Sequence, residues 1–473
     1  MKVLKFGGTS VKNAEAINNV YNIISNQNDD IVVVVSAMSG VTDILVSLSE
    51  SKNITFINER LSYLLDKHIS EANKLNLDNK TINYIIKQID ELKLFLENNA
   101  ENFNSKSYYD KIVSYGEVLS SFIVNSYFTS KSLNSFHLDS RNLITTDNEF
   151  GAANVLSDVT EHKINKAINN ILEDNKIVKT LGSVSNISSK NYNQNTIFVA
   201  GGFIASTIEG KSTTLGRGGS DFSGAIYAAM LNAEVLEVWT DVDGILTCDP
   251  RLIPNAKLIS HLSYLEAAEL AYFGAKVLHP KTILPAVERK IPVVVKNTFH
   301  PLSNGTAIFD RENNPKMIKA IAFRKKVTVI NIVSNRMLGA YGFLNSVFEI
   351  FQQYKTSVDL VATSEVSISL TIENESKLTE IIYELNNFSS VTCTKNNAII
   401  SVVGEGIKQT AGIAARFFGV LSDINIYMVS VGASEVNLSI VVNQDDMENC
   451  VKKLHYEFFE KNELDNSVFI ELN

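Results

Sequence analysis

The sequence predicts an α/β protein in which a central, mostly parallel sheet lies between helices and is followed by two small βαββαβ modules. Unbroken β-branched runs such as residues 31–35 alternate with helix-length segments, which is typical of a parallel sheet covered on both faces. A chain of 473 residues also exceeds one ordinary hydrophobic core. After about residue 315 a strand–helix–strand–strand pattern occurs twice in the same register. We therefore expect one large sheet domain and two small modules.

The first predicted strand ends in KFGGTS, residues 5–10. Gly7 and Gly8 lack the Cβ atoms that keep backbone amides away from an anion. Lys5 enters this turn from the strand and can place a positive charge on a phosphate. An ordinary glycine turn with a solvated lysine has the same local sequence, so these residues alone leave both interpretations open.

The next strand, in the run IVVVVSAMSGVTD over residues 31–43, ends in small and hydroxyl residues. Ser36 would lie at its carboxyl end, where α/β folds bind ligands. Thr42 has two interpretations, a ligand contact or a cap for the following helix. Residues 56–100 have a helical period, which predicts His68 as a half-exposed helix residue.

Residues 107–128 predict one helix with Glu117 beside Gly116 near its middle. A glycine there costs about 1 kcal/mol relative to alanine, and close approach of another group would explain it. A solvated glutamate beside a tolerated glycine is the alternative. Further strands are predicted over residues 136–140, 176–182 and 197–203.

The segment TTLGRGGSDFSGA, residues 213–225, places Arg217 among three glycines before a helix. Its planar guanidinium fits a carboxylate or a phosphate in bidentate fashion. Asp221, near the helix N-terminus, is compatible with ordinary capping. Residues 234–251 predict a strand and an acidic loop, but the spacing lacks the glycine and closing glutamate of an EF-hand, so no metal site is predicted.

Composition limits the possible functions. A net charge of −9 and the absence of a basic stripe argue against a nucleic-acid partner. Three widely spaced cysteines suit neither a disulfide framework nor a zinc site, which indicates a reducing compartment. No apolar run reaches membrane-spanning length and the N-terminus has no signal-peptide pattern, so we expect a cytoplasmic protein with no membrane partner.

Taken together, the motifs resemble those of the aspartate kinase (aspartokinase) family, which has an amino-acid kinase fold followed by tandem ferredoxin-like ACT domains. The matching elements occur in family order over nearly the whole chain: KFGGTSV, VVSAMSGVTD, VSYGE, TLGRGGSD, WTDVDG with DPR, FGAKVLHP and VDLVATSE. The resemblance implies a catalytic domain over residues 1–312 and ACT domains over residues 313–397 and 398–473.

The resemblance also assigns roles to individual residues. Lys5 would act on the transferring phosphoryl group and Asp221 would organise the catalytic lysines. The aspartate-binding positions are Ser36, Thr42, Glu117, Arg217, Gly218, Gly219 and Ser220, with Glu117 on the substrate ammonium and Arg217 on its α-carboxylate. The nucleotide-contacting positions are Lys5, Gly7, Gly8, Thr240, Asp241, Leu246, Arg251, Lys276 and Val277. Leu246 stands where the family usually has an aromatic residue near the adenine.

The implied reaction is ATP-dependent phosphorylation of the β-carboxylate of L-aspartate, the first step of the pathway to lysine, threonine and methionine. Because this nucleophile is already ionised, the enzyme must hold two anions together and neutralise charge on the γ-phosphoryl oxygens. Mg²⁺ would be carried on the nucleotide, since no dedicated carboxylate cage is evident in the sequence.

Lysine is the implied feedback effector. The retained effector positions are Met337, Phe343, Leu344, Val358, Asp359, Ser364 and Glu365, whereas lysine-inhibited members carry polar residues at Gly339 and Ala340. Asp359 and Glu365 could bind the effector ammonium, although acidic residues at strand ends are also commonly just solvated. Sheet edges of ACT domains pair, so a homodimer is expected, and a tetramer stays open.

Two alternatives are a different enzyme of the same fold and, in another class, a sensing protein without catalysis. Another amino-acid kinase fold enzyme is disfavoured by the VSYGE glutamate and by the C-terminal repeat. An amino-acid-sensing protein with an inactive kinase domain is disfavoured because Lys5, Glu117, Arg217 and Asp221 are all present.

Overall fold

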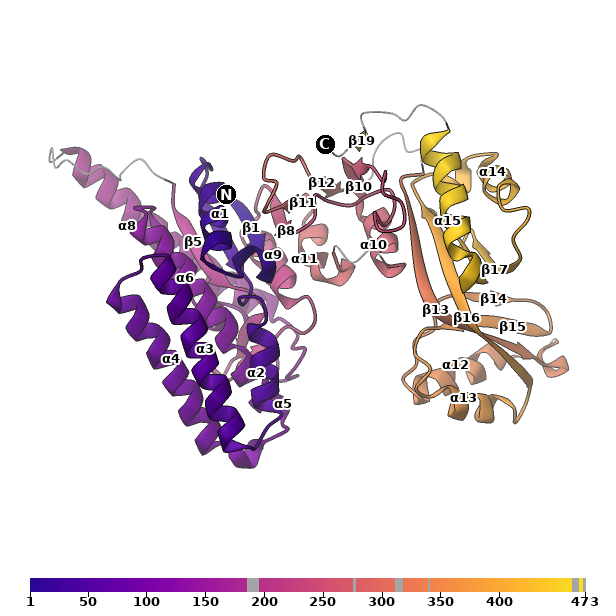
Figure 1. Ribbon diagram of the computed structural model, residues 1–473, viewed down its shortest axis with the longest axis horizontal. Helices are drawn as coiled ribbons and strands as arrows, with labels where there is room; N and C mark the ends of the chain where they lie inside the picture. The colour runs from indigo at the N-terminus through magenta and orange to yellow at the C-terminus, as the bar shows by residue number, and fades with distance from the viewer. Residues whose placement is uncertain (185–194, 275–277, 311–317, 339–340, 462–467, 471–473) are drawn as a thin grey trace. The chain divides into compact units, whose positions relative to one another are not determined.

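The computed structural model describes residues 1–473 except 185–194, 275–277, 311–317, 339–340, 462–467 and 471–473 (Figure 1). The chain divides into two compact units. The first unit comprises Met1–Gly244 and His279–Asp310, and the second unit comprises Ile245–Leu278 and Arg311–Asn473. The predicted limits of the three domains stay a prediction.

The first unit is built on a sheet whose strands follow the order β12-β11-β8-β1-β2-β5-β3. Neighbouring strands from β11 to β3 run parallel, and β12 pairs antiparallel with β11. The strands are β1 (Lys2–Phe6), β2 (Ile31–Val35), β3 (Ser135–Leu138), β5 (Ile197–Gly201), β8 (Leu236–Thr240), β11 (Val293–Asn297) and β12 (Thr306–Phe309). A small sheet in the order β4-β6-β7 comprises β4 (Thr145–Thr146), β6 (Ile204–Thr207) and β7 (Ser212–Thr214).

Helices pack against this sheet. They are α1 (Ala14–Ser25), α2 (Val41–Ser49), α3 (Ile54–Lys74), α4 (Asn79–Asn98), α5 (Lys106–Val113), α6 (Tyr115–Ser130), α7 (Ser140–Leu143), α8 (Ser157–Val184), α9 (Gly219–Met230) and α11 (Leu284–Glu288). Short 3₁₀ turns are η1 (Gly8–Val11), η2 (Ala100–Asn102) and η3 (Pro280–Thr282). Helices α3, α4 and α6 lie side by side in Figure 1, where α3 packs against α4 and α4 packs against α6.

One hydrophobic core joins the sheet to these helices. Leu4 of β1 and Val33 of β2 belong to the same buried cluster as Leu61 of α3, Leu92 of α4 and Ile123 of α6. Each such side chain contributes about 1.5–3 kcal/mol by leaving water. The unbroken apolar run of β2 is buried at every residue, which confirms the prediction of a strand covered on both faces.

Three sequence predictions for the first unit were wrong. Residues 107–128 form two helices that meet at Ser114, whose hydroxyl donates to the carbonyl of Lys111 (2.7 Å) and so competes with the helical backbone bonds. Residues 176–182 continue helix α8, because a short apolar run does not distinguish a strand from a helix. His68 is fully buried, and its Nδ1–H donates to the Leu64 carbonyl (2.7 Å). Burial lowers the pKa of His68 to about 4.

The second unit contains a six-stranded sheet in the order β14-β15-β13-β16-β18-β17. Its strands are β13 (Ala320–Val333), β14 (Val361–Thr363), β15 (Ser367–Ile372), β16 (Ser390–Val403), β17 (Ile426–Val431) and β18 (Asn437–Asn443). Its helices are α10 (Tyr264–Tyr272), α12 (Phe343–Gln353), α13 (Leu378–Leu385), α14 (Ile413–Gly419) and α15 (Met447–His455). Short 3₁₀ turns are η4 (Asn335–Met337), η5 (Ile407–Gln409) and η6 (Gln444–Asp446), and a π-helix, η7, spans Tyr456–Glu460. Strands β9 (Leu258–Ile259) and β19 (Phe469–Ile470) pair antiparallel, and β10 (His261–Ser263) precedes α10.

The predicted repeat is confirmed, and its two modules share their longest strands. Gly342 and Gly412 occupy the same place in each module, as left-handed N-caps of α12 and α14 (φ 83° and 88°). Strands β13 and β16 pair antiparallel from Ala320 opposite Val403 to Val333 opposite Ser390. The last half of β13 therefore belongs to the first module, whereas its first half closes the sheet of the second module.

Helix α10 begins with a capping box, which generates a stability prediction. Ser263 Oγ accepts from Glu266 N (3.3 Å), and Glu266 Oε2 accepts from Ser263 N (2.8 Å). Ser263→Ala should lower the free energy of unfolding by about 1 kcal/mol, as the loss of an N-cap does elsewhere. Urea denaturation measures the change, and the exposed Ser357→Ala variant should unfold like the parent protein. Equal midpoints for the parent and the Ser263 variant would contradict the capping role.

Candidate active site

Parallel strands of the first unit end together at one edge of the sheet. Gly7 follows β1, Ser36 follows β2, Gly202 follows β5 and Asp241 follows β8. Backbone N–H groups of the first three donate to the carbonyl at the end of a neighbouring strand at 2.8–3.1 Å, which fixes these turns relative to one another. In sheets of this kind, ligands bind outside the carboxyl ends of the strands.

An ion pair between a buried lysine and a half-buried aspartate lies at this edge. Lys5, the next-to-last residue of β1, is 8% exposed, and its Nζ lies 2.6 Å from Oδ1 of Asp221 in the first turn of α9. Helix α9 approaches closely because Gly224 lacks a side chain; a Cβ there would lie 3.2 Å from Lys5 Cβ. The left-handed Gly218 is the N-cap of α9, so Asp221 pairs with the lysine instead of capping the helix.

Glu117 brings a second buried carboxylate close to this pair. It lies in the first turn of α6, is 3% exposed, and accepts through Oε1 from the backbone N–H of Ala37 (3.1 Å). Its Oε2 has no hydrogen-bond partner among the described residues. Burial raises the pKa of Glu117 to about 8, and the Ala37 N–H and the Lys5 charge oppose this rise. An unpartnered buried carboxylate oxygen is an acceptor suited to a cation.

Gly116, beside Glu117, permits the close approach of another segment, as the sequence suggested. A Cβ on Gly116 would lie 2.8 Å from Ala37 Cβ and 3.2 Å from a methyl of Leu45. Close approach of the loop after β2 therefore requires the glycine, and this same approach lets Ala37 N–H reach Glu117. The alternative of a solvated glutamate is wrong.

The glycine-framed arginine lies on the turn before α9. Gly216 and Gly218 both have left-handed backbones (φ 73°), and a Cβ on Gly218 would lie only 2.6 Å from Cγ2 of Thr282. Arg217, between them, is exposed and forms no ion pair with any residue that the structure describes. Its guanidinium is available for an anionic ligand.

The other predicted substrate residues lie around the same edge of the first unit. Ser36 is half-buried, and its carbonyl accepts from the hydroxyl of Ser120 (2.7 Å). Ser220 is so near the end of β5 that a Cβ on Gly202 would lie 2.8 Å from Ser220 Cα. Thr42 lies in the first turn of α2, whose N-cap is Gly40 with no side-chain bond, so the capping interpretation of Thr42 is wrong.

The predicted nucleotide contacts are distributed over both units. In the first unit, a Cβ on Gly8 would lie 3.0 Å from the carbonyl of Ala37, so this turn requires a glycine. Thr240, at the end of β8, donates through Oγ1 to Asp241 (3.2 Å). Leu246 and Arg251 belong to the second unit, where Arg251 is exposed and pairs with Asp249 (2.6 Å). Lys276 and Val277 lie outside the described residues.

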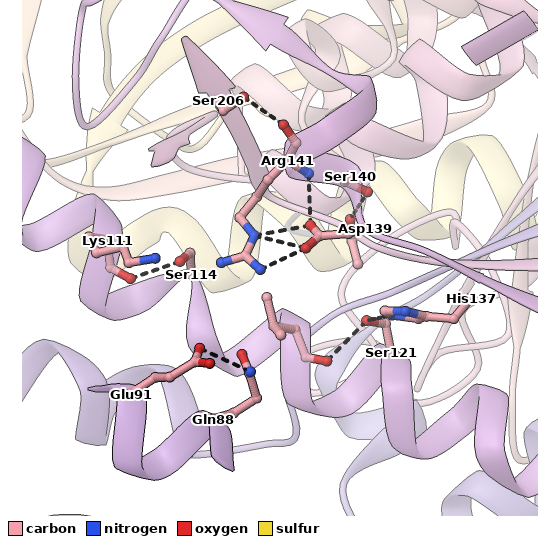
Figure 2. Close-up of polar contacts among 12 residues, drawn as sticks. Gln88, Glu91, Lys111, Ser114, Ser121, His137, Asp139, Ser140, Arg141 and Ser206 are labelled. Carbon is pink, nitrogen blue, oxygen red and sulfur yellow. Dashed lines mark hydrogen bonds and ion pairs between the residues drawn. The ribbon is translucent and has the colours of Figure 1, made fainter. Parts of the chain in front are cut away.

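Figure 2 shows a polar cluster that the sequence analysis missed, at the carboxyl end of β3. Asp139 accepts from Arg141, with Oδ2 2.6 Å from Nη2, and Ser140 donates to the carbonyl of Gly201 (2.5 Å). Burial and the neighbouring Arg141 charge lower the pKa of Lys111, which lies close by. The cluster fixes the end of β5 just before Gly202. The opposite charges of LDSR, at the end of the strand predicted over residues 136–140, were the available signal.

Comparison with known proteins identifies the family. Residues 1–297 match the amino acid kinase family, and residues 400–458 match an ACT domain. The chain is 36% identical to aspartokinase 3, chloroplastic, of Arabidopsis thaliana (97% of this chain, 81% of the relative). It is 33% identical to lysine-sensitive aspartokinase 3 of Escherichia coli, over 97% of this chain and 99% of the relative. This chain belongs to the aspartokinase family.

Solved structures of E. coli aspartokinase III agree with this assignment. The complex with lysine and aspartate superimposes with a TM-score of 0.80, at 33% identity, over 97% of this chain and 100% of that chain. The complex with aspartate and ADP has a TM-score of 0.77 at 32% identity, over the same shares. The amino-acid kinase fold with C-terminal ACT domains is thereby confirmed.

The first ACT module of this aspartokinase contains a hollow of about 410 Å³. It is lined by Met337, Leu338, Gly342, Phe343, Leu344, Ser364 and Glu365, which include five predicted effector residues. Two others lie elsewhere. Val358 packs against the hydrophobic core of this module, and Asp359 pairs with Arg324 (2.8 Å) and accepts from the hydroxyl of Tyr272 (3.1 Å). Gly339 and Ala340 lie outside the described residues.

The described residues contain no group of three or more His, Cys, Asp or Glu residues that could hold a metal ion. Within the same residues, no helix is long and apolar enough to cross a membrane.

The raised pKa of Glu117 makes a prediction about stability. Its pKa is about 8 in the folded protein against 4.5 for an ordinary glutamate, so folding takes up a proton between these values. The contribution of this group is fully present below pH 4.5 and is lost as the pH rises through 8. Glu117→Gln should therefore remove part of the decline in unfolding free energy between pH 5 and pH 9.

Urea unfolding at several pH values measures this difference. The exposed Glu101→Gln variant should keep the slope of the parent protein. An equally steep decline in the Glu117 variant would show that Glu117 is ionised at neutral pH in the unliganded protein.

Proposed function

We propose that this aspartokinase transfers the γ-phosphoryl group of ATP to the β-carboxylate of L-aspartate at the carboxyl edge of the first-unit sheet. The observation that carries the proposal is the largely buried Lys5–Asp221 pair (2.6 Å), together with a Glu117 oxygen that has no hydrogen-bond partner among the residues that the structure describes. The ammonium of Lys5 at the end of β1 suits the anionic phosphates of ATP, and that oxygen of Glu117 suits the ammonium group of aspartate. The product is 4-phospho-L-aspartate.

Each charged group has one task in this scheme. Glu117 receives the substrate ammonium, which replaces the missing hydrogen-bond partner of Oε2. The exposed Arg217 takes the α-carboxylate. Lys5 stabilises charge that develops on the transferring phosphoryl oxygens, and Asp221 orients its ammonium. The β-carboxylate needs no general base because it is ionised at neutral pH.

ATP fits the glycine turn after β1. A Cβ on Gly8 would lie 3.0 Å from the Ala37 carbonyl, so a glycine at this position keeps the backbone of the turn accessible. Thr240, Asp241, Leu246, Arg251, Lys276 and Val277 complete the proposed nucleotide contacts. Mg²⁺ would neutralise phosphate charge and is proposed to bind through the nucleotide.

Lysine is the proposed feedback effector, because E. coli aspartokinase III has been solved with lysine bound and the first ACT module has a hollow of suitable size. Glu365, which lines the hollow, supplies a carboxylate for an ammonium group. We also propose a homodimer through the ACT sheets. Their edge strands, β14 and β17, expose apolar side chains such as Val361, Tyr427 and Val431, which pairing would cover.

Lys5→Ala tests the proposed reaction. Removal of one electrostatic donor should raise the barrier by on the order of 3 kcal/mol and lower kcat about a hundredfold. The hydroxamate assay for aspartyl phosphate, with ATP and Mg²⁺ at saturation, measures the loss. Lys12→Ala, an exposed lysine in the same segment, should keep the parent rate. Near-normal turnover of the Lys5 variant would exclude the proposed role.

Glu365→Gln tests the effector site. Loss of a charge-assisted contact should raise the lysine concentration for half-inhibition about tenfold, while kcat without lysine stays unchanged. The matched control is Glu435→Gln, the corresponding glutamate of the second module. If millimolar lysine neither inhibits the parent enzyme nor gives a calorimetric signal, lysine is not the effector.

A further inference from the structure

A chain of hydrogen bonds links the last helix of the second unit to the loop that follows residue 244. Thr247 Oγ1 lies 3.0 Å from His455 Nε2, and His455 Nδ1 lies 2.7 Å from Oε1 of Glu460. Thr247 is fully buried and His455 is 1% exposed. The hydrogen bond between Thr247 and His455 is therefore shielded from water and costly to lose, whereas Glu460 at the end of the chain is exposed.

The neighbours of this chain fix the positions of its protons. The backbone N–H of Lys257 donates to Thr247 Oγ1 (3.0 Å), so the threonine hydroxyl is left to donate to His455 Nε2. His455 Nδ1 then carries the proton that points to Glu460. Burial lowers the pKa of His455, although Glu460 opposes the change, and this agrees with a neutral ring.

An unusual backbone places Glu460 beside His455. Helix α15 ends at His455 and continues as the π-helix Tyr456–Glu460, in which Lys461 N donates to the carbonyl of Tyr456 (2.9 Å). The wider turn brings the side chain five residues further along onto the imidazole. π-helices are rare and occur often at functional sites. The backbone departs from ordinary helical geometry where it completes this chain of bonds.

The loop that Thr247 belongs to is anchored to the second unit at several points. Thr247 donates to the Lys257 carbonyl (2.9 Å) and accepts from the backbone N–H of Ile321 in β13 (2.8 Å). Strand β9, at the end of the loop, pairs with β19 near the C-terminus. Leu246 and Arg251 lie in this loop, and both are proposed nucleotide contacts. Of these anchors, the contact to His455 is the one made by a side chain of an ACT helix.

We propose that His455 is a positioning residue for ATP, holding the loop of Leu246 and Arg251 through Thr247. This inference rests on the proposed function, because it takes these two residues as nucleotide contacts. The imidazole does not touch the nucleotide; it fixes the threonine that precedes Cys248 in the loop. A change that separates His455 from Thr247 is transmitted to the affinity for ATP, and the affinity for aspartate is left unchanged.

Thr247→Val is the sharpest test, because it removes the hydroxyl and keeps the shape of the side chain. The KM for ATP should rise about tenfold, with kcat and the KM for aspartate within about twofold of the parent values. Thr247→Ser, which keeps the hydroxyl, should restore the parent KM. His455→Phe should match Thr247→Val, and the double variant should be no worse than either single variant, because all three lose the same interaction.

A buried substitution elsewhere on α15 separates positioning from general destabilisation. Val451→Ala removes buried methyl groups without touching the hydrogen bonds, so it should lower the melting temperature and leave the KM for ATP unchanged. An unchanged KM in Thr247→Val, or an equal rise in Val451→Ala, would overturn the inference. A parent protein that binds ATP in calorimetry but forms no aspartyl phosphate would overturn the proposed function instead.

Discussion

The ion pair between Lys5 and Asp221 is the interaction on which the arrangement of the candidate active site depends. An ammonium and a carboxylate 2.6 Å apart, both largely out of water, are stable only while each has the other. The sheet order places β1 between β2 and β8, so its lysine is surrounded by strands on both sides. Gly224 lets α9 approach closely enough for its carboxylate to reach the lysine. Removal of one charge from such a pair costs about 3–5 kcal/mol in other proteins.

The two buried carboxylates differ because their surroundings differ. Asp221 pairs with Lys5, whereas Glu117 accepts from one backbone N–H, and its second oxygen has no hydrogen-bond partner within the described part of the chain. Burial therefore favours the neutral form of Glu117 until a cation arrives. In the proposed function, binding of the substrate ammonium and ionisation of Glu117 are therefore coupled.

Local sequence predicted those features that depend on neighbouring residues along the chain. The buried strand β2, the repeat and the need for close packing at Gly116 followed from β-branched runs, register and the cost of a mid-helix glycine. Features that depend on distant partners were missed or wrong. The helical period of residues 56–100 could not show that other parts of the protein bury His68 on α3. Nothing in residues 107–128 showed that the Ser114 hydroxyl would donate to a backbone carbonyl. The Asp139–Arg141 pair has a local signal in the sequence, but nothing local showed that Ser140, between them, donates to the carbonyl of Gly201.

The two long strands shared by the ACT modules affect the order in which the chain folds as it is synthesised. The first half of β13 leaves the ribosome before the whole first module, yet its partner, the last half of β16, is made only after that module is complete. Domains generally fold as they emerge, N-terminal parts first. In this protein the first module can fold early, while the first half of β13 stays unpaired until the end of β16 has been synthesised. The newly made chain therefore exposes an aggregation-prone strand for the time needed to translate one entire module.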